Sequence, residues 1–363
     1  MEHTLLVVGD NLKANPLMMQ YLYRNYEKHF GTKGSVHFCS KNNNDLFLVL
    51  EEMMQRYDVL TIAASSESFS LIGKVLSTLS GDALELKTQT LVPSRAAAYE
   101  KDSYLLDLAT GQVNVIKVVE TCTLPPLLSH IQKGSVLFSL IGMDEDSCQI
   151  LLSPLTQTYD VKMLTTPLIE GWLLIEAKSN KHGELASFLK GVKSLFPEKM
   201  IETNDAVEHI VQKLIANNKT ITCAESCTGG LIASMLTQKA GVSAAINGTL
   251  VTYANPIKES WLGVDADILK QYGAVSEECV RGMLEGALGV AKASYAIATS
   301  GIAGPTGGTP EKPVGTVYIG VASDTGSFQV ERLLLDGDRE YIQQQSAFHA
   351  LKLLLQLDSK MFF

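Results

Sequence analysis

The sequence has no long hydrophobic run, and this absence excludes the simplest membrane architectures. No stretch of 18 consecutive apolar residues occurs in the chain, so we expect no membrane-spanning helix. The first ten residues, MEHTLLVVGD, lack the basic start and the long apolar segment of a secretory signal peptide. We therefore expect a cytoplasmic protein.

Cysteine is sparse, and basic residues are outnumbered by acidic ones. The six cysteines include no CxxC pair, and no Cys/His cluster has zinc spacing, so we expect reduced thiols and no metal or other cofactor. The 30 Lys and Arg against 39 Asp and Glu give a formal charge of −9. Because an acidic surface repels phosphate backbones, nucleic acid is not an expected partner.

Length and hydrophobic content indicate an ordered protein of several domains. The 363 residues exceed the roughly 250 at which a single core stops growing. A hydrophobic content of 46% with 19% charged residues argues against disorder. Alternating strand and helix patterns predict an α/β domain over 1–142, a small α+β domain over 143–201 and an α/β sandwich over 202–363.

The hydrophobic periodicity also predicts individual elements. The expected strands cover 5–8, 59–64, 113–119, 135–141, 161–164, 172–177, 220–223, 249–253, 295–299, 316–322 and 328–335. The expected helices cover 17–26 and 183–195 and begin near Thr203 or Asn204, Thr228, Asn255, Ser276 and Arg339.

The first candidate site is the segment 224–230, AESCTGG, between a predicted strand and a predicted helix. Backbone N–H groups and the dipole of a helix start favour negative charge above such a turn, and Gly229 and Gly230 let a ligand approach closely. The turn with Ser226 and Thr228 therefore suits a phosphate, a carboxylate or an oxyanion. Taken alone, the same residues are also compatible with an ordinary helix cap.

A second candidate is Lys258, in the first turn of the helix that follows Tyr253. A helix start is already electrostatically positive, so this position lowers the lysine pKa and favours the neutral amine as a base. A lysine beside a serine can remove the hydroxyl proton without a histidine, which makes Ser226 and Lys258 a candidate catalytic pair. An ordinary surface lysine is the alternative.

Two further candidates follow the third strand of the sandwich. The segment 301–315 has five glycines and three prolines, and a rigid loop after a strand end is a frequent ligand site in α/β sheets; Ser300, Gly301 and Gly304 are its candidate substrate contacts. Arg339 opens the last helix and could contact a phosphate in bidentate fashion, or pair with a neighbouring aspartate. Cys227 is a rival nucleophile to Ser226.

These motifs in this order resemble the CinA C-terminal domain family, whose stand-alone members are nicotinamide mononucleotide deamidases. The matching strings are ITCAESCTGGLIASML, NGTLVTYANPIKESWLGV, YGAVSEECVRGMLEGAL, TSGIAGPTGGTPEKPVGTVYIGVA and DGDRE, over about 160 residues. The resemblance implies metal-free hydrolysis of the carboxamide of nicotinamide mononucleotide to nicotinate mononucleotide and ammonia, as part of pyridine nucleotide salvage.

The resemblance also assigns roles to residues of this sequence. Ser226 would be the nucleophile, Lys258 its base, and Tyr253 would assist in positioning or proton transfer. Ser300 lies where the family often has Thr, so a hydroxyl is kept, and Arg339 would contact the substrate. Relatives are commonly oligomeric, which implies at least a homodimer.

Full-length relatives carry a molybdopterin-binding-like domain and a small KH-like domain before this region, and the layout here is similar. The first domain departs from the family pattern: VGDNL replaces a VGTELL-type start, AASSES (63–68) replaces a GGLGPT-type turn, and no PGPP-like string occurs. The lost glycines would allow close phosphate approach, so we expect a degenerate domain without ADP-ribose pyrophosphatase activity, retained for assembly or regulation. A non-catalytic nucleotide sensor or scaffold, and an amidase acting on another small amide through Cys227, are the alternatives for the whole protein.

Overall fold

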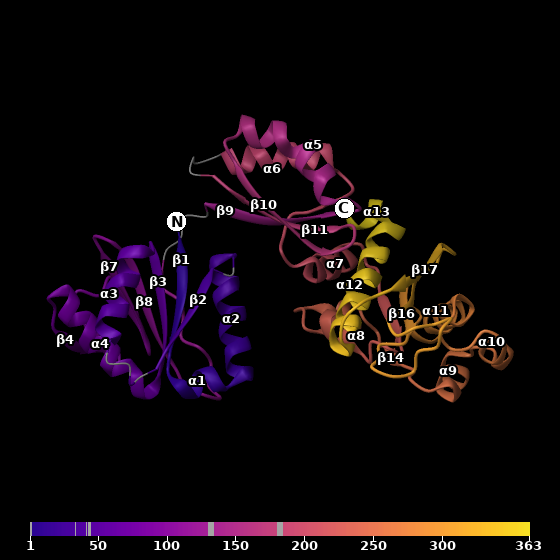
Figure 1. The fold of residues 1–363 in the computed structure, drawn as a ribbon, viewed down its shortest axis with the longest axis horizontal. Coiled ribbons are helices and arrows are strands. Elements are labelled where there is room, and N and C mark those ends of the chain that lie inside the picture. Colours follow the sequence, from indigo (N-terminus) through magenta and orange to yellow (C-terminus); the bar gives the residue numbers. More distant parts are fainter. Residues whose placement is uncertain (1, 33, 41, 43–44, 130–133, 180–183) are drawn as a thin grey trace. The chain divides into compact units, whose positions relative to one another are not determined.

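The computed structural model describes the whole chain except residues 1, 33, 41, 43–44, 130–133 and 180–183 (Figure 1). It divides into two compact units, Met1–Val136 and Leu137–Phe363. The division falls ahead of the boundary expected at residue 142, because strand β9 (Ser135–Ile141) pairs with β12 (Met200–Ile201) of the second unit.

The first unit has a six-stranded sheet in the order β2-β1-β3-β8-β7-β6, in which neighbours from β2 to β8 are parallel and the last two pairs are antiparallel. Its strands are β1 (His3–Val8), β2 (Ser35–Cys39), β3 (Val59–Ser65), β6 (Ala98–Glu100), β7 (Ser103–Leu108) and β8 (Gly111–Val118), with a separate hairpin of β4 (Leu84–Lys87) and β5 (Thr90–Pro93). Its helices are α1 (Asp10–Ala14), α2 (Pro16–Phe30), α3 (Leu46–Arg56) and α4 (Ser66–Ser80).

Both faces of this sheet are buried, which explains the unbroken apolar run at the start of the sequence. Leu5 and Val7 of β1 join a core with α2, whereas Leu6 and Val8 join a core with α3 and α4. A strand covered by helices on both faces has no solvent-facing positions that would require polar residues. The first unit is therefore the α/β layer that the sequence predicts.

The second unit is built around a five-stranded sheet in the order β14-β13-β15-β16-β17. Strand β13 (Ile221–Glu225) is parallel to β14 (Leu250–Val251) and β15 (Tyr295–Gly301), and β16 (Thr316–Ser323) and β17 (Phe328–Leu334) continue the sheet antiparallel. The surrounding helices are α7 (Ala206–Ala216), α8 (Leu231–Thr237), α9 (Asn255–Leu262), α10 (Ala266–Gln271), α11 (Glu277–Ala291), α12 (Arg339–Leu357) and α13 (Ser359–Phe362), with a 3-10 turn η1 (Val242–Ala244).

These helices form a sandwich with the sheet. Helices α7, α8 and α12 share one core with Ile221 and Ile297, and α9, α10 and α11 share the other with Ala224 and Ala298. The side facing α11 is lined by alanines, which let the helix pack close to the strands. The carboxyl ends of β13, β14 and β15 therefore meet at one edge of the sheet, where the candidate motifs follow.

A smaller sheet completes the second unit, in the order β10-β11-β9-β12, with β10 (Lys162–Ile169), β11 (Trp172–Lys178), α5 (Glu145–Thr158) and α6 (Glu184–Leu195). Residue 183, the expected first residue of α6, lies outside the described residues. Ile141 and Trp172 belong to the same core as α12, and the rings of Trp172 and Phe348 meet at 5.4 Å. The expected boundary at 201/202 therefore lies inside one continuous unit.

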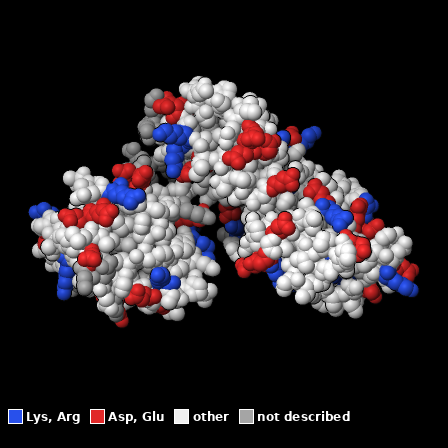
Figure 2. All heavy atoms as spheres, in the orientation of Figure 1, with Lys and Arg blue, Asp and Glu red and all other residues white. Residues whose placement is uncertain are grey.

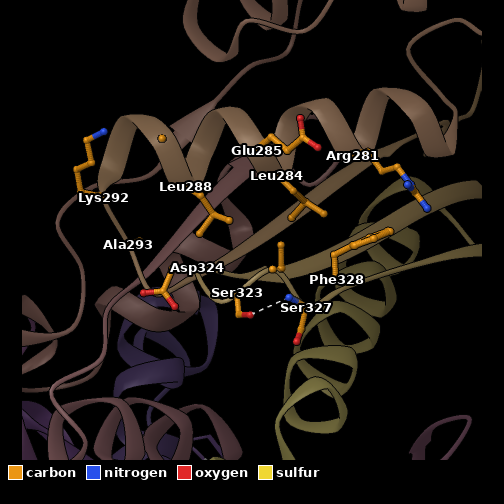
Figure 3. Close-up of a pocket in the computed structure, with 13 residues that line it drawn as sticks. Arg281, Leu284, Glu285, Leu288, Lys292, Ala293, Ser323, Asp324, Ser327 and Phe328 are labelled. Atoms are coloured by element: carbon orange, nitrogen blue, oxygen red, sulfur yellow. Dashed lines mark hydrogen bonds between the residues drawn. The ribbon is translucent and has the colours of Figure 1, made fainter.

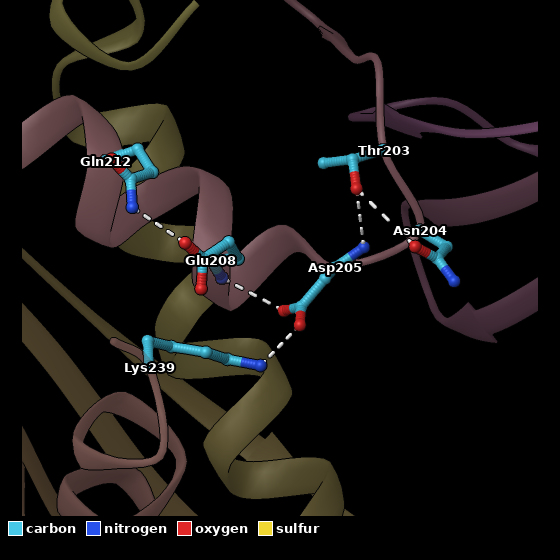
Figure 4. Close-up of polar contacts among 6 residues, drawn as sticks. All are labelled: Thr203, Asn204, Asp205, Glu208, Gln212 and Lys239. Carbon is cyan, nitrogen blue, oxygen red and sulfur yellow. Dashed lines mark hydrogen bonds and ion pairs between the residues drawn. The ribbon is translucent and has the colours of Figure 1, made fainter. Parts of the chain in front are cut away.

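The segment that joins the two sheets is held by Asp205 (Figure 4). Its carboxylate accepts the N–H of Glu208 at 2.9 Å and so caps α7, and it also forms an ion pair with Lys239. The cap expected at Thr203 or Asn204 was placed too early; the Thr203 hydroxyl accepts the N–H of Asp205 instead. Two bonds to one carboxylate thus fix where α7 begins.

The charged side chains of the described residues are dispersed. On the face shown in Figure 2, acidic and basic groups are scattered among uncharged residues, and no continuous basic surface is visible among the residues drawn in colour. None of the helices in the described part of the chain is both long and apolar enough to cross a membrane.

Candidate active site

The turn 226–230 separates the end of β13 from the start of α8. The N–H of Ser226 donates to the Thr299 carbonyl at 3.0 Å, which extends the pairing of β13 and β15 by one residue. Gly229 and Gly230 then adopt positive φ angles of 62° and 96°, a backbone region that side chains disfavour. The helix expected to start near Thr228 therefore begins only at Leu231.

Ser226 and Lys258 lie together although 32 residues separate them. The Lys258 amine is 3.1 Å from the Ser226 hydroxyl oxygen, and its residue is 1% exposed. The same amine donates to the carbonyls of Thr252 at 2.7 Å and Tyr253 at 3.1 Å. Two carbonyls can take two N–H groups of a neutral amine, and this leaves the third position, a lone pair, directed at Ser226.

The environment of Lys258 favours that neutral form. Burial lowers the pKa of the Lys258 amine below its ordinary value of 10.5. The helix dipole expected from the sequence acts in the same direction, but burial is the leading cause. Lys258 extends back from α9 into the interior beneath the turn.

Glu225 is a central residue of the turn that the sequence argument missed. It is fully buried, and its carboxylate accepts the Thr228 hydroxyl at 2.6 Å and three backbone N–H groups. These belong to Gly230 at 3.1 Å, Ile232 at 3.1 Å and Ala233 at 2.8 Å. A buried carboxylate with four donors is well satisfied, so it fixes the turn to the start of α8.

This carboxylate changes the interpretation of the helix start. The N–H groups expected to attract an external anion already donate to Glu225. In the described structure, the amides of Cys227 and Thr228 donate no hydrogen bond to another residue, and both residues are buried. These two amides, rather than the start of α8, are the donors available to a developing oxyanion beside Ser226.

Thr299 and Ser300 point to opposite sides of β15. The Thr299 hydroxyl is 2.7 Å from that of Thr228, whose own proton goes to Glu225, so Thr299 donates and supports the turn from below. The Ser300 hydroxyl was expected to contact substrate, but it is 1% exposed and donates to the Ala274 carbonyl at 2.7 Å. The Ser300 O–H group is therefore already used, and it anchors the start of the Gly/Pro loop 301–315.

The Gly/Pro loop is tied down at several points. Lys312 donates to the carbonyls of Tyr272 at 2.9 Å and Val275 at 2.7 Å. At Gly315 an added Cβ would lie 1.9 Å from the Leu335 carbonyl oxygen, so only glycine fits there. A Cβ added at Gly301 would likewise lie only 2.7 Å from Cγ2 of Val317. The loop is thus held in place, as its composition predicts.

Arg339 joins this loop to Tyr253. Its guanidinium donates to the Gly304 carbonyl at 2.8 Å and to the Tyr253 hydroxyl at 3.0 Å. Tyr253 follows the short strand β14 and is 61% exposed, so its ring stands at the surface and not beside the Lys258 amine. Arg339 and Tyr253 therefore form a bridge at the rim of the site.

A hollow of about 320 Å³ adjoins the turn. It is lined on one side by Thr228, Gly229, Gly230 and Ser234 and on the other by Glu340 and Gln343 of α12. The Gln343 amide donates to the Cys227 carbonyl at 2.6 Å. A small polar molecule in this hollow would lie next to the segment that carries Ser226.

Cys227 is poorly suited to nucleophilic attack. It is 4% exposed, and burial raises the pKa of its thiol to about 12. The thiolate, which is the reactive form, is therefore scarce near neutral pH. The hydroxyl of Ser226 is the stronger candidate of the two neighbours.

The corresponding turn of the first unit has no such constellation. Helix α4 begins at Ser66, directly after β3, and the Ser65 hydroxyl caps it by accepting the N–H of Ser68 at 3.3 Å. The space above Gly9 is filled, because an added Cβ there would lie 2.8 Å from that of Ser65. In the described part of the chain, no group of three or more His, Cys, Asp or Glu could hold a metal ion.

Comparisons with known proteins agree on one family. The model described as the CinA C-terminal domain matches residues 203–357. The "Putative competence-damage inducible protein" of Thermoanaerobacter pseudethanolicus is 34% identical over 267 residues, which are 70% of this chain and 64% of that one. A "CinA-like protein" of Anaeromyxobacter sp. strain Fw109-5 is 50% identical over 145 residues, 40% of this chain and 35% of its own.

Solved structures with similar names match part of the chain at comparable identity. The competence/damage inducible protein CihA from Agrobacterium tumefaciens is 37% identical; the match covers 42% of this chain and 96% of that one, with a TM-score of 0.40. A CinA superfamily protein from Klebsiella pneumoniae 700603 is 35% identical, with 43% and 96% coverage and a TM-score of 0.41. On the family model and the curated relatives, this α/β multidomain protein with a buried Ser–Lys pair belongs to the CinA family.

Proposed function

We propose that the C-terminal domain hydrolyses the carboxamide of nicotinamide mononucleotide, giving nicotinate mononucleotide and ammonia. The observation that carries this proposal is the 3.1 Å contact between the Ser226 hydroxyl and a buried lysine amine held by two carbonyls. A neutral amine in this setting is a base for the serine, and no histidine is needed. The substrate itself is inferred from the family resemblance, since the contacts of Ser226 and Lys258 support only the type of chemistry.

The proposed reaction has two steps. Ser226 Oγ attacks the carboxamide carbon while Lys258 takes the hydroxyl proton and delivers it to the departing nitrogen, so that the C–N bond breaks and ammonia leaves. Water then attacks the resulting ester, gives a proton through Lys258 to Ser226 Oγ, and releases the carboxylic acid. The amides of Cys227 and Thr228 would stabilise the tetrahedral oxyanion in both steps.

The remaining site residues would bind the nucleotide. Arg339 stands at the rim, where two of its N–H groups donate to Gly304 and Tyr253. Its positive charge would attract the substrate phosphate. The hollow beside Gly229 and Gly230 offers hydroxyl, amide and carboxylate groups that suit sugar hydroxyls. Ser300 would act through the position of the loop.

The test is ammonia release from nicotinamide mononucleotide by the full chain in the presence of EDTA. Wild type should release ammonia, Ser226→Ala should not, and Ser260→Ala, an exposed serine on α9, should behave as wild type. Full activity of Ser226→Ala would remove the proposed nucleophile.

A nucleotide-binding scaffold is the second candidate function, and the altered turn of the first unit favours it. It predicts a thermal shift on adding nicotinamide mononucleotide without ammonia release. For residues 1–136 we propose a role in assembly or regulation; cobalt- or magnesium-dependent hydrolysis of ADP-ribose by the Ser226→Ala protein would contradict it.

A further inference from the structure

A cavity of the second unit lies at the end of the sheet opposite the candidate active site. It has a volume of about 620 Å³ and lies between α11 and the β16–β17 hairpin. Ala293, just before β15, lines it, whereas Ser300 is at the other end of that strand. Seven strand residues span about 20 Å, so this cavity is separate from the Ser–Lys pair.

Apolar side chains line the middle of this cavity, here called the slot, and converge from two elements (Figure 3). Leu284 and Leu288 point from α11 toward the strands, and Phe328 lies on the hairpin below them. Ala293 and Leu284 are almost fully buried and lie on the inner side of the slot, whereas Phe328 remains 47% exposed. A volume within the roughly 300–1,000 Å³ of small-molecule sites favours a small ligand over a protein segment.

The two ends of the slot carry opposite charges. Arg281 lies over the Phe328 ring at 4.0 Å from its centroid and is paired with Glu277, so its position is fixed. Asp324 stands at the other end, near the carboxyl terminus of α11, where the helix dipole adds partial negative charge. In the described structure the Asp324 carboxylate has no hydrogen-bond or ion-pair partner, although its backbone N–H is bound to the Ser294 carbonyl.

The spacing of these groups fixes the shape of a suitable ligand. Arg281, Leu284 and Leu288 recur on one face of α11, and the stretch from Arg281 to Lys292 is about 16 Å long at the helical rise. Lys292 and Glu285 also line the opening, but their side chains point away from the strands. An elongated molecule with an apolar middle and charged ends would match this surface.

We propose that this slot binds a small zwitterion whose flat apolar body lies between Leu288 and Phe328, with its cationic group at Asp324 and its anionic group at Arg281. Aromatic bodies suit the exposed face of Phe328, since ring contacts add stabilisation beyond the buried area. This binding function is separate from the proposed amide hydrolysis and does not depend on it.

The test uses three matched elongated probes with the full chain: 4′-(aminomethyl)biphenyl-4-carboxylate, which carries both charges, biphenyl-4-carboxylate, which lacks the cation, and 4-(aminomethyl)biphenyl, which lacks the anion. Calorimetric titration should show saturable binding of the zwitterion and roughly tenfold weaker binding of the other two, the usual effect of losing one charged hydrogen bond. Absence of saturable zwitterion binding in the low-millimolar range would overturn the proposal.

Substitutions of residues that line the slot show whether the probes bind there. Asp324→Asn should weaken binding of the zwitterion and of the amine probe but not of the carboxylate probe. Arg281→Gln should weaken binding of the zwitterion and of the carboxylate probe but not of the amine probe. Leu288→Trp should block binding of all three by filling the slot. The controls are Asp267→Asn and Leu334→Trp, exposed residues outside it. Affinity that is unchanged in Asp324→Asn, or that is lost in Lys258→Ala, would assign the probes to another site; ammonia release is measured separately and decides the proposed function alone.

Discussion

The two units each place a turn between a buried strand of a parallel pair and a helix, but only one of these turns holds reactive groups. After β3, helix α4 starts at the next residue, and serines cap it. After β13, five residues intervene before α8, and Glu225 takes over the capping from inside the strand. Delaying the helix leaves room for Ser226 to meet a side chain from another element.

The two turns differ in whether the residue that caps the helix is also the residue that could react. At the first turn the Ser65 hydroxyl is itself the helix cap, so this hydroxyl is not available to react. At the second, Glu225 and Thr228 satisfy the helix start, and Ser226 is free to contact Lys258. A reactive hydroxyl at a strand-to-helix turn thus requires a separate residue for the structural task.

The largest effect should come from removing the lysine that distinguishes the second turn. Lys258→Met should reduce ammonia release by at least about 100-fold, the lower range for a lost general base. Because burial lowers the Lys258 pKa below 10.5, wild-type activity should rise with pH as the amine loses its proton. The pH–rate profile measures this, with Lys270→Met on α10 as the control; a variant that keeps the wild-type profile would exclude Lys258 as the base.

A second variant alters Glu225, which holds the turn in place, and leaves the proposed base Lys258 unchanged. Glu225→Gln replaces one acceptor oxygen by an NH₂ group and leaves buried N–H donors unsatisfied, so the free energy of unfolding should fall by about 1–3 kcal/mol. Turnover should fall as well, mainly in kcat, because Ser226 loses its fixed position. Urea denaturation and steady-state kinetics test this against Glu259→Gln, an exposed glutamate on α9; unchanged stability would show that the four bonds are dispensable.

Acid should affect the second unit through His349 of α12. This residue is 5% exposed, and burial lowers its pKa from 6.5 to about 4. The unfolded chain then binds the proton more readily, so stability present above pH 6.5 is lost as the pH falls toward 4, by up to about 3 kcal/mol. Urea denaturation at several pH values should show this loss in wild type and a smaller one in His349→Gln; equal slopes would contradict it.

The smallest effect should come from the turn of the first unit. Ser65→Ala removes a helix cap and should cost about 1 kcal/mol of stability while ammonia release stays unchanged. Thermal denaturation together with the ammonia assay measures both. A loss of activity in this variant would mean that the first unit contributes to catalysis.

Much of the fold could be predicted from the sequence, because the signals were local. Serine at 276 and the apolar face of α11 marked that helix correctly, and the strands β1, β9 and β16 were found within a few residues. The helix starts were less certain. At α9 the N-cap is Ala254, with Pro256 in the first turn, where Asn255 was expected to cap.

The errors at the candidate site share one physical cause. A sequence motif shows which groups are present but not which of them already have partners. The sequence places Glu225 in the turn without a role and Ser300 as a substrate contact, whereas the structure gives both side chains internal partners. The one available signal for Glu225 was a charged residue closing an otherwise apolar strand, since such a residue is rarely buried without donors.

The occupied amides at the start of α8 also provide a way to follow binding in solution. The N–H groups of Ile232 and Ala233 should exchange with deuterium only when the turn opens, because Glu225 holds them. The amides of Cys227 and Thr228 have no such bond and are shielded by burial alone. A bound molecule that places a negative oxygen against Ser226 would slow exchange at these two positions and leave their neighbours unchanged, which makes this short segment an internal reporter of occupancy.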